Sequence, residues 1–513
     1  MNPSMTHRFA DRPLPWLLLL AALLRVIAAF QPGFHHPDAI YQYLEPAHRL
    51  LTGDGVVTWE WRVGMRSWLL PLLLAGPMAL GEALGPAGPW PVAMPRLAMG
   101  LASLSIVWSA WTLGRRRSPI AGLLAGFVAA TWFECIYFGV QTLAEPVATA
   151  AFLPAAVLVT AERPTRRAAA AAGALLALAI LMRPHYAPSA AVLILVAWWP
   201  FARRPRDDSA HRTARRTAHW TALIGGGLAV AAVSACVDLA AGAVPFGWIV
   251  ENVRQNIVGG VAATYGVSPP LTYAKWLFQT WLVWSVPIAI GLRAGWRANP
   301  ALLIAACVTI GVHSLIGHKE YRFIYLAIVA IVILSAIGWG EMIDRAATRW
   351  SAARVRAAGL AVGVGWGAAA LLLPMAPLAW AHQREGVPGS QVFALLRDDP
   401  ATCGVALLYG ASFADLPGSS GLRPHTPLAL FWIDDPATGG DGPWQALVRN
   451  RSGFNRIVGS VPKTGTIPAG YRTVMCEPAT TVIGLCLYAR PGPCSDTRNS
   501  PFRINRVLAR RKF

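Results

Sequence analysis

"YRFIYLAIVAIVILSAIGWG", residues 321–340, is twenty residues long and carries one charge, Arg322, beside its first residue. A helix of about 20 mostly apolar residues crosses the hydrocarbon core of a bilayer. Ten further apolar segments recur along the chain of 513 residues, two of them short, at 14–31, 92–113, 118–135, 142–160, 168–182, 186–201, 220–241, 274–292, 298–316 and 357–380. The sequence therefore predicts an α-helical polytopic membrane protein with about eleven transmembrane helices.

The composition and the charge pattern agree with this prediction. Hydrophobic residues make up 55% of the chain and charged residues only 14%, which is too apolar for a soluble protein of this size. The net charge of +20 does not indicate nucleic acid as a partner, because no nucleic-acid-binding motif accompanies it. The predicted loops on one side hold twenty Lys and Arg, against seven on the other side up to residue 322. Basic loops stay in the cytoplasm, so we expect the N-terminus inside and the C-terminus outside.

Residues 67–85 are also apolar, but they contain Pro71 and Pro77. Counting them as a span would place Arg115, Arg116 and Arg117 outside, against the charge rule. We therefore expect juxtamembrane helices here, within a first outer loop that covers residues 32–91.

The chain changes character after residue 380, which ends the predicted transmembrane domain of residues 1–380. Residues 381–513 are richer in Gly, Pro, Asp and Thr and contain the β-like runs "GVALLYG", "LALFWI" and "TVIGLCLYA" between turn signals. They predict a small extracytoplasmic domain of α/β or mainly β type.

The seven cysteines divide between these two parts. Cys135, Cys236 and Cys307 lie in or beside apolar segments, where a buried thiol is the default expectation. The other four, Cys403, Cys476, Cys486 and Cys494, lie in the C-terminal domain. In an oxidising compartment they can form two disulfides. No cysteine or histidine spacing indicates zinc.

Polar side chains gather in the stretch "FHHPDAIYQYLEPAHRL", residues 34–50, on the predicted outer face. Asp38 can cap a helix that begins at Ala39 or accept a proton from a substrate. Glu45 and Arg49 are four residues apart and can form a helical ion pair. Three tryptophans follow, and interfacial anchoring is their commonest role at a membrane surface: Trp59, Trp61 and Trp68.

A second polar group, "HSLIGHKEYRF" at residues 313–323, falls on the same predicted face. A charged helix end facing water is the simple explanation, just as Gly266 after Tyr265 can merely form a turn. Lys319 and Arg322, however, are three residues apart, so on a helix they share a face and can bind one anion, such as a lipid-linked phosphate. With Asp38 as a general base, these groups suit glycosyl transfer from a lipid phosphate sugar.

Five segments together resemble glycosyltransferase family 22, the mannosyltransferases that build GPI anchors and N-glycan precursors from dolichol-phosphate mannose. They are "HPDAIYQYLEPAHRLLTGDGVVTWEW" followed by "MRS", "PRL" at 95–97, "QTLAEP", "ENVRQN…YGVSP…Y" and "GHKEYRF". The resemblance covers roughly residues 14–340. It implies the GT-C superfamily of multi-span, inverting, metal-independent enzymes without a cofactor.

The resemblance also implies residue roles. Asp38 would be the catalytic base, and the donor phosphate would be bound by His318, Lys319 and Arg322. Further substrate-binding residues would be His36, Gln42, Glu45, Glu60, Arg66, Asn252, Asn256 and Tyr265. Two departures from the family pattern stand out: Ala39 replaces a usual glutamate after Asp38, and Gln141 replaces an arginine. If the missing glutamate binds the acceptor in the family, the acceptor differs here; if it is catalytic, either Glu45 substitutes for it or the activity is weakened.

The leading hypothesis is thus an integral-membrane glycosyltransferase that moves a sugar, most plausibly mannose, from a polyprenyl-phosphate sugar to a glycan or glycolipid acceptor. We expect it in a bacterial inner membrane with its site facing the periplasm, equivalent to the luminal face of the ER membrane in a eukaryote. The alternatives are a lipid-glycan transporter or flippase, for which Arg25 is the one mid-span charge, and an inactive GT-C homologue. No glycine-rich nucleotide loop or DxD pattern indicates a nucleotide-sugar donor. The sequence leaves the oligomeric state open.

Overall fold

The computed structural model describes residues 13–162, 165–202, 209–409, 416–440, 442–459, 467–477 and 485–511. The chain divides into two compact units, which are described separately below. Unit 1 comprises Met1–Ala29 and Leu97–Ala381, and unit 2 comprises Phe30–Arg96 and His382–Phe513. The sequence grouped the loop 32–91 with the transmembrane domain, whereas the structure groups it with the C-terminal residues.

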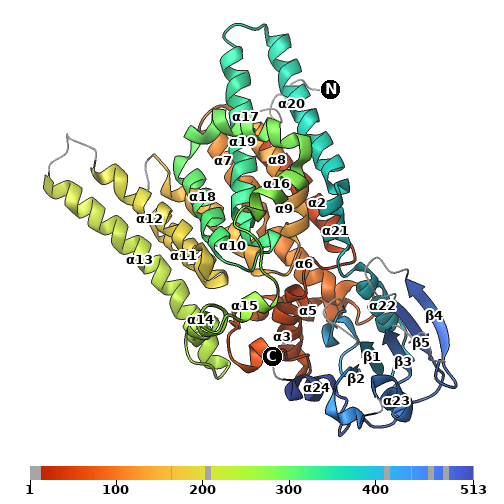
Figure 1. Ribbon diagram of the computed structural model, residues 1–513. Helices are drawn as coiled ribbons and strands as arrows, with labels where there is room; N and C mark the ends of the chain where they lie inside the picture. Colours follow the sequence, from red (N-terminus) through yellow and green to blue (C-terminus); the bar gives the residue numbers. More distant parts are fainter. Residues whose placement is uncertain are drawn as a thin grey trace. The chain divides into compact units, whose positions relative to one another are not determined.

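Unit 1 is built from helices, and each of the eleven predicted segments contains helix among the described residues (Figure 1). Its elements are α2 (Pro13–Ala29), α6 (Trp90–Ala102, shared with unit 2), α7 (Leu104–Arg115), α8 (Pro119–Thr131), α9 (Phe133–Gly139), α10 (Ala144–Val159), α11 (Arg166–Met182), α12 (Ala187–Ala202), α13 (Ser209–Ala240), α14 (Gly247–Val253), α15 (Val261–Thr264), α16 (Thr272–Trp281), α17 (Ser285–Gly295), α18 (Pro300–Leu315), α19 (Tyr325–Ala346), α20 (Ala352–Leu372) and α21 (Pro377–Arg384, shared with unit 2).

Five helical stretches of the described chain are long and apolar enough to cross a membrane: Trp90–Arg115, Thr217–Ala240, Thr272–Ala298, Tyr321–Ala346 and Ala352–Met375. A sixth results if α8 and α9, which are bent by 51° at Trp132, count as one span. Five further apolar helices are shorter, among them Leu69–Leu84, the predicted juxtamembrane segment. The fold is therefore that of a polytopic helical membrane protein, and the number of eleven spans stays a prediction.

Helix α19 lies at the centre of unit 1, and most of its apolar residues from Tyr325 to Ile337 are buried. It packs against α17 through glycines, because a Cβ added at Gly338 would lie 1.9 Å from the Gly291 carbonyl oxygen and one at Gly295 would lie 2.1 Å from that of Leu334. Small residues that let helix backbones touch are a common basis of helix packing in membranes. The expectation of buried thiols is correct for Cys135 and wrong for Cys236 and Cys307, whose helix faces are exposed.

Arg25, the mid-span charge, has a structural role. It is fully buried, and its guanidinium donates to the carbonyl oxygens of Ala130 at 2.6 Å and Ala129 at 3.1 Å and to Ser103 Oγ at 3.1 Å. Both carbonyls belong to the last turn of α8, where helical carbonyls lack partners. Arg25 therefore caps the broken end of α8, so it lends no support to a transport pathway.

Unit 2 combines the first loop with a five-stranded sheet. The loop forms a π-helical turn, η1 (Ala39–Leu44), and α3 (Glu45–Thr52), α4 (Trp59–Arg62) and α5 (Leu69–Leu84). The sheet has the order β2-β1-β3-β5-β4, with β1 (Val405–Tyr409) parallel to β2 (Leu428–Trp432) and β3 (Arg456–Gly459). β5 (Leu485–Ala489) runs antiparallel to β3 and β4 (Arg472–Glu477). Around it lie α22 (Val387–Asp398), α23 (Gly442–Arg449) and α24 (Ile504–Arg510).

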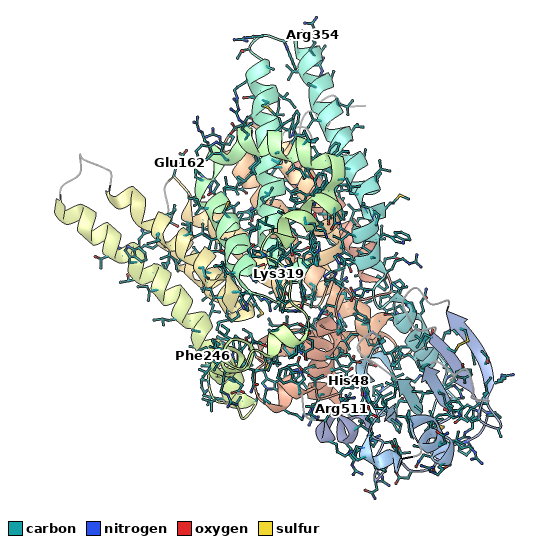
Figure 2. All side chains as sticks on the ribbon, viewed as in Figure 1. His48, Glu162, Phe246, Lys319, Arg354 and Arg511 are labelled. Atoms are coloured by element: carbon teal, nitrogen blue, oxygen red, sulfur yellow. A yellow bond between two sulfur atoms is a disulfide. The ribbon has the colours of Figure 1, made fainter. Side chains whose placement is uncertain are left out.

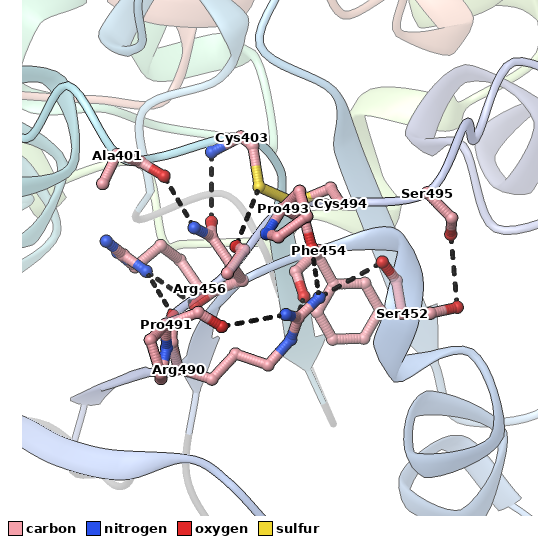
Figure 3. The surroundings of a disulfide bond; sticks show 12 residues. Ala401, Cys403, Ser452, Phe454, Arg456, Arg490, Pro491, Pro493, Cys494 and Ser495 are labelled. Carbon is pink, nitrogen blue, oxygen red and sulfur yellow. Dashed lines mark hydrogen bonds between the residues drawn. A yellow bond between two sulfur atoms is a disulfide. The ribbon is translucent and has the colours of Figure 1, made fainter.

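The four cysteines of unit 2 form two disulfides, Cys403–Cys494 and Cys476–Cys486, as the sequence predicted. Beside the first, Asn455 donates to the Ala401 carbonyl and accepts from the Cys403 N–H, while the Arg490 guanidinium donates to the carbonyls of Phe454, Ser452 and Pro493 (Figure 3). These side chains satisfy the backbone of loops that make no sheet hydrogen bonds. Of the two predicted types, α/β or mainly β, the described residues show an α/β domain. Residue 410 of the first β-like run and residues 481–484 of the third lie outside the described residues.

We predict that Arg25→Met lowers the thermal unfolding midpoint of the purified protein without abolishing any activity below that midpoint. The variant leaves carbonyls of α8 buried and unpaired, which costs on the order of 2 kcal/mol. Circular dichroism during heating in detergent measures the shift. An unchanged midpoint together with a lost function would contradict the capping role.

Candidate active site

Lys319, labelled in Figure 2, lies in the connection between α18 and α19. Residues 316–320 are not helical, Glu320 has an extended backbone with φ −132° and ψ 144°, and a 3-10 turn, η6 (Tyr321–Ile324), precedes α19. The expectation that Lys319 and Arg322 share a helical face is therefore wrong. The helix period does not apply across this break.

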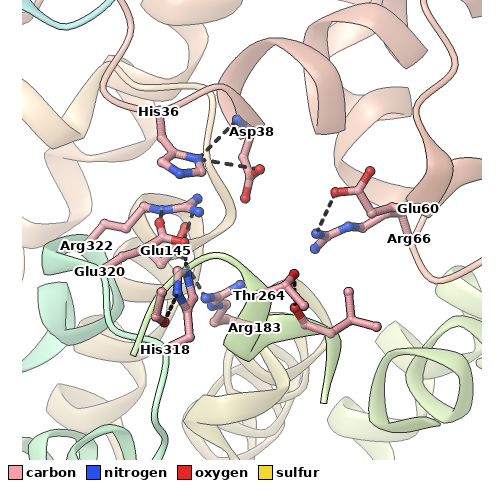
Figure 4. A network of polar contacts seen from close by, with 12 residues as sticks. His36, Asp38, Glu60, Arg66, Glu145, Arg183, Thr264, His318, Glu320 and Arg322 are labelled. Atoms are coloured by element: carbon pink, nitrogen blue, oxygen red, sulfur yellow. Dashed lines mark hydrogen bonds and ion pairs between the residues drawn. The ribbon is translucent and has the colours of Figure 1, made fainter. Parts of the chain in front are cut away.

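A line of alternating charges runs through this part of unit 1 (Figure 4). His318 Nε2 lies 3.0 Å from Glu320 Oε1, and Arg322 Nε donates to Glu320 Oε2 at 2.5 Å. Arg322 Nη1 then lies 3.5 Å from Glu145 Oε1, which also pairs with Arg183 Nη2 at 3.2 Å. Glu145 and Arg322 are almost completely buried. Burial of such charges requires pairing, and this line supplies it.

Lys319 differs from its cationic neighbours. It is only 7% exposed, and its ammonium donates to the carbonyl oxygen of Ile316. Among the described residues no carboxylate forms an ion pair with it. A positive charge that is mostly buried without a negative partner is unfavourable on its own, so this position favours an incoming anion.

Glu134 holds the cationic segment in place from inside unit 1. Its carboxylate is fully buried and accepts from Trp132 Nε1 and Trp281 Nε1, each at 2.8 Å, and from the Tyr321 hydroxyl. Three donors from three segments converge on two oxygens, which suits an ionised carboxylate because it only accepts. Through Tyr321 this cluster fixes the residue that precedes Arg322.

The long loop before α16 reaches the same segment of unit 1. Tyr265 and His318 have ring centroids 6.1 Å apart, and the Gly266 carbonyl oxygen lies 3.2 Å from His318 Nδ1. Gly266 has φ +110°, so it does form a turn that favours glycine. Asn256 donates to Asn252 at 3.3 Å one helical turn away, and both are half-buried. Among the described residues neither asparagine forms a hydrogen bond with the charged line.

Asp38 belongs to unit 2, where η1 begins at Ala39 directly after it. Its side chain makes no capping hydrogen bond, so the capping alternative is wrong. His36 Nδ1 accepts the Asp38 backbone N–H at 3.2 Å and lies 3.4 Å from Asp38 Oδ1. In a neutral His36 the proton then sits on Nε2. Asp38 keeps about a fifth of its side chain exposed, so its carboxylate remains accessible.

Gln42, Glu60 and Arg66 form one polar group in unit 2. Gln42 Nε2 donates to Glu60 Oε1 at 2.8 Å. Arg66 Nη2 lies 3.7 Å from the same oxygen, and Figure 4 shows this pair. Gln42 Oε1 is buried and lacks a hydrogen-bond partner in the described chain. Trp61 donates to the Tyr41 carbonyl at 3.1 Å, and its ring lies 4.5 Å from that of Trp68. Both rings are half-buried and pack on each other.

Glu45 is fully buried, and its two carboxylate oxygens accept the backbone N–H groups of Val56 at 2.6 Å and Ser420 at 2.7 Å. Burial raises the pKa of this carboxyl group, while the hydrogen bonds act against that rise. Within the described residues it forms no ion pair with Arg49, whose side chain is exposed, so the helical ion pair is wrong. Both oxygens are occupied, and its predicted substrate contact stays a prediction.

Sequence reasoning missed Glu134, Glu145 and Arg183 as site residues. Each is an ionisable residue in or beside an apolar segment, and such residues point to functional sites. Glu145 was visible inside "QTLAEP". Among the described residues no cluster of three or more His, Cys, Asp or Glu could hold a metal ion.

Comparisons with known proteins agree with this picture. The profile of the Alg9-like mannosyltransferase family matches residues 16–403. GPI mannosyltransferase 3 of Yarrowia lipolytica is 31% identical over 330 residues, which are 61% of this chain and 61% of that protein. Human GPI alpha-1,2-mannosyltransferase 3 is 26% identical over 323 residues, 60% of this chain and 55% of its own. The chain thus spans about three fifths of the length of the curated relatives it matches.

Among solved structures, ArnT from Cupriavidus metallidurans, crystallised with undecaprenyl phosphate, has a TM-score of 0.55 at 13% identity. The match covers 94% of this chain and all of that one. At this identity the likeness shows the fold alone, which is of the GT-C type.

We predict that Glu134→Ala destabilises the protein by on the order of 3 kcal/mol, because three buried donors lose their acceptor. Glu134→Gln keeps one accepting oxygen and should have a smaller effect. Thermal unfolding in detergent measures both. Equal midpoints for Glu134→Ala and the unaltered chain would rule out the anchoring role.

Proposed function

Because the chain belongs to the Alg9-like mannosyltransferase family, we propose that it is a membrane mannosyltransferase that uses a polyprenyl-phosphate sugar as donor. The observation that carries this proposal is Lys319, a mostly buried lysine whose ammonium has no carboxylate partner among the described residues. A donor phosphate supplies the missing negative charge. The apolar helices of unit 1 suit a donor whose tail stays in the bilayer.

In the proposed reaction an acceptor hydroxyl oxygen attacks C1 of the donor sugar, and the bond between C1 and the phosphate oxygen breaks. The configuration at C1 inverts, from a β-linked donor to an α-linked product. The hydroxyl proton passes to the carboxylate of Asp38, acting as general base. The polyprenyl phosphate leaves with an additional negative charge, and Lys319 stabilises that charge as it develops.

The remaining residues divide into supporting roles. Arg322 already pairs with Glu320 and Glu145, so we propose that it mainly stabilises the line of charges. With His318 it would also contact the donor phosphate from the edge of the site. Gln42, Glu60 and Arg66 are assigned to acceptor binding, since Gln42 Oε1 lacks a donor in the described chain and suits a sugar hydroxyl. His36, Asn252, Asn256 and Tyr265 are proposed as further substrate contacts.

We further propose that transfer takes place on the extracytoplasmic face of a bacterial inner membrane and that the acceptor is a glycan or glycolipid. The distribution of basic loops and the two disulfides support this placement. A flippase has less support, since Arg25 caps α8. An inactive homologue is disfavoured by the retained Asp38 and Lys319.

We predict that Asp38→Asn lowers kcat roughly a thousandfold, because general-base catalysis contributes 10²–10⁴. Lys319→Ala should lower kcat/KM roughly a hundredfold through loss of phosphate stabilisation. Transfer of radiolabelled mannose from undecaprenyl-phosphate mannose to octyl α-mannoside in membranes measures both.

Matched controls exist in the same units. Asp496→Asn changes an exposed aspartate of unit 2, and Lys275→Ala removes an exposed lysine of α16. Both should retain full activity. Full activity in Asp38→Asn and Lys319→Ala would reject the proposed site.

The pH dependence offers a separate test. The hydrogen bond to Glu320 raises the pKa of His318 above its ordinary value of about 6.5. The imidazolium charge is therefore fully present below about pH 6.5 and is lost as the pH rises through the raised pKa. We predict that the donor KM increases roughly threefold to tenfold as the pH rises through this range, from the loss of one nearby charge. His318→Gln should flatten the profile, and an unchanged profile in that variant would contradict the assignment.

A further inference from the structure

The segment Asp54–Val57 in unit 2 runs without helix or strand between α3 and α4. Gly55 and Val56 are nevertheless buried. Buried backbone N–H and C=O groups require hydrogen-bond partners. Here side chains supply them. The Asp54 and Gly55 N–H groups donate locally to Thr52 Oγ1 at 3.1 Å and Asp54 Oδ1 at 3.0 Å.

The next two N–H groups donate to residues that are distant in sequence. Val56 donates to Glu45 Oε2 at 2.6 Å, and Val57 donates to Asn505 Oδ1 at 2.8 Å. The same Asn505 amide donates through Nδ2 to the Gly55 carbonyl oxygen at 2.8 Å. Asn505 thus binds Gly55 and Val57 on one side of the extended segment, and Glu45 binds Val56 from the other.

Asn505 is itself held firmly by the sheet of unit 2. The residues before it continue the free edge of β2, because Leu430 N donates to the Phe502 carbonyl at 2.8 Å and Ala429 bridges Arg503. Helix α24 buries Val507 and Leu508, and Arg510 binds both carboxylate oxygens of Asp435, at 3.1 and 2.6 Å. The position of Asn505 is therefore set by the C-terminal domain.

Glu45 makes a second connection of the same kind. Its other oxygen accepts the Ser420 N–H, and a Cβ at Gly418 would lie 2.5 Å from that oxygen. The Tyr41 hydroxyl donates to the Leu416 carbonyl at 2.7 Å. Arg397 adds bonds to the Pro86 and Ser420 carbonyls and to Glu82. The first loop is thus tied to the C-terminal domain at several separate points.

The segment Asp54–Val57, bound by Glu45 and Asn505, leads directly into α4, which carries Glu60 and Trp61. We infer that Asn505 and Glu45 are positioning residues, through which the C-terminal domain sets the placement of Glu60 on α4. This inference rests on the proposed function for the acceptor role of Glu60. Asn505 lies beyond residue 403, where the family match ends, so the domain contributes to the site from outside the matched region.

Asn505→Ala tests the inference. The variant removes both bonds to the segment, and we expect a roughly tenfold higher KM for octyl α-mannoside, with kcat and the KM for undecaprenyl-phosphate mannose unchanged. Hydrogen exchange at the Val57 amide should become faster. Asn505→Asp keeps the oxygen that accepts from Val57 but cannot donate to Gly55, so its effects should be intermediate. Arg506→Gln, an exposed change on the same helix, is the control and should behave as the unaltered chain.

Glu45→Gln provides an independent variant, since its amide accepts through only one oxygen. It should raise the same acceptor KM and speed exchange at Val56 or Ser420. If Asn505→Ala fails to accumulate in membranes, Asn505→Asp and Glu45→Gln test the inference through the acceptor KM and the hydrogen exchange rate. Unchanged exchange over residues 55–57, or an equal rise in both KM values, would overturn the inference.

The outcome is distinguishable from failure of the proposed function. Faster exchange and a raised acceptor KM in Asn505→Ala, with full activity in Asp38→Asn and Lys319→Ala, would keep the positioning role and reject the proposed chemistry. Inactive Asp38→Asn and Lys319→Ala with an unaffected Asn505→Ala would do the reverse. Hydrogen exchange requires no turnover, so it measures the hydrogen bonds of Asn505 and Glu45 to residues 55–57 whatever the substrate is.

Discussion

The polar part of unit 1 depends on Lys319, a mostly buried lysine whose ammonium carries a positive charge. Its neighbours Arg183, Arg322 and His318 share two carboxylates, those of Glu145 and Glu320. These pairings leave Lys319 as the cation without a carboxylate partner within the described chain. A cluster with no net charge would have little affinity for a phosphate. A cluster of cations without carboxylates would be destabilised, because like charges repel strongly in a medium of low dielectric. A cluster that leaves only the Lys319 charge without a carboxylate partner avoids both problems.

The helices, the two disulfides and the α/β character of the C-terminal domain were predictable from the sequence. Long apolar segments have few alternatives in a membrane, and four cysteines in a domain outside the membrane readily pair. The geometry of the site was less predictable. Lys319 and Arg322 seemed to share a helical face, but the extended Glu320 lies between them. Glu45 seemed to pair with Arg49, whereas it accepts from Val56 and Ser420. Contacts over hundreds of residues leave no periodic signal in a sequence.

The same physical requirement explains both Glu134 and Glu45. Each is a buried carboxylate that gathers donors from separate segments, indole and phenol groups in one case and backbone N–H groups in the other. A buried carboxylate destabilises the fold unless its hydrogen bonds are formed. The segments that carry the donors are therefore held in one arrangement. Buried carboxylates here define the path of the chain beside residues proposed to bind substrate, and they need not touch a substrate to affect it.

Ala39 shows how this reasoning bears on specificity. The resemblance to glycosyltransferase family 22 implies a glutamate at this position, directly after the proposed base, where this chain has alanine. In the structure Ala39 is fully buried at the start of η1, and its N–H donates to the His36 carbonyl at 3.0 Å. A glutamate here would have to displace neighbouring side chains or turn η1, and either change would also move Asp38. The buried Ala39 therefore helps to set the orientation of the Asp38 side chain. A different acceptor preference in this chain would then arise from the orientation of the loop and from Glu60, Gln42 and Arg66, with no direct contact from residue 39.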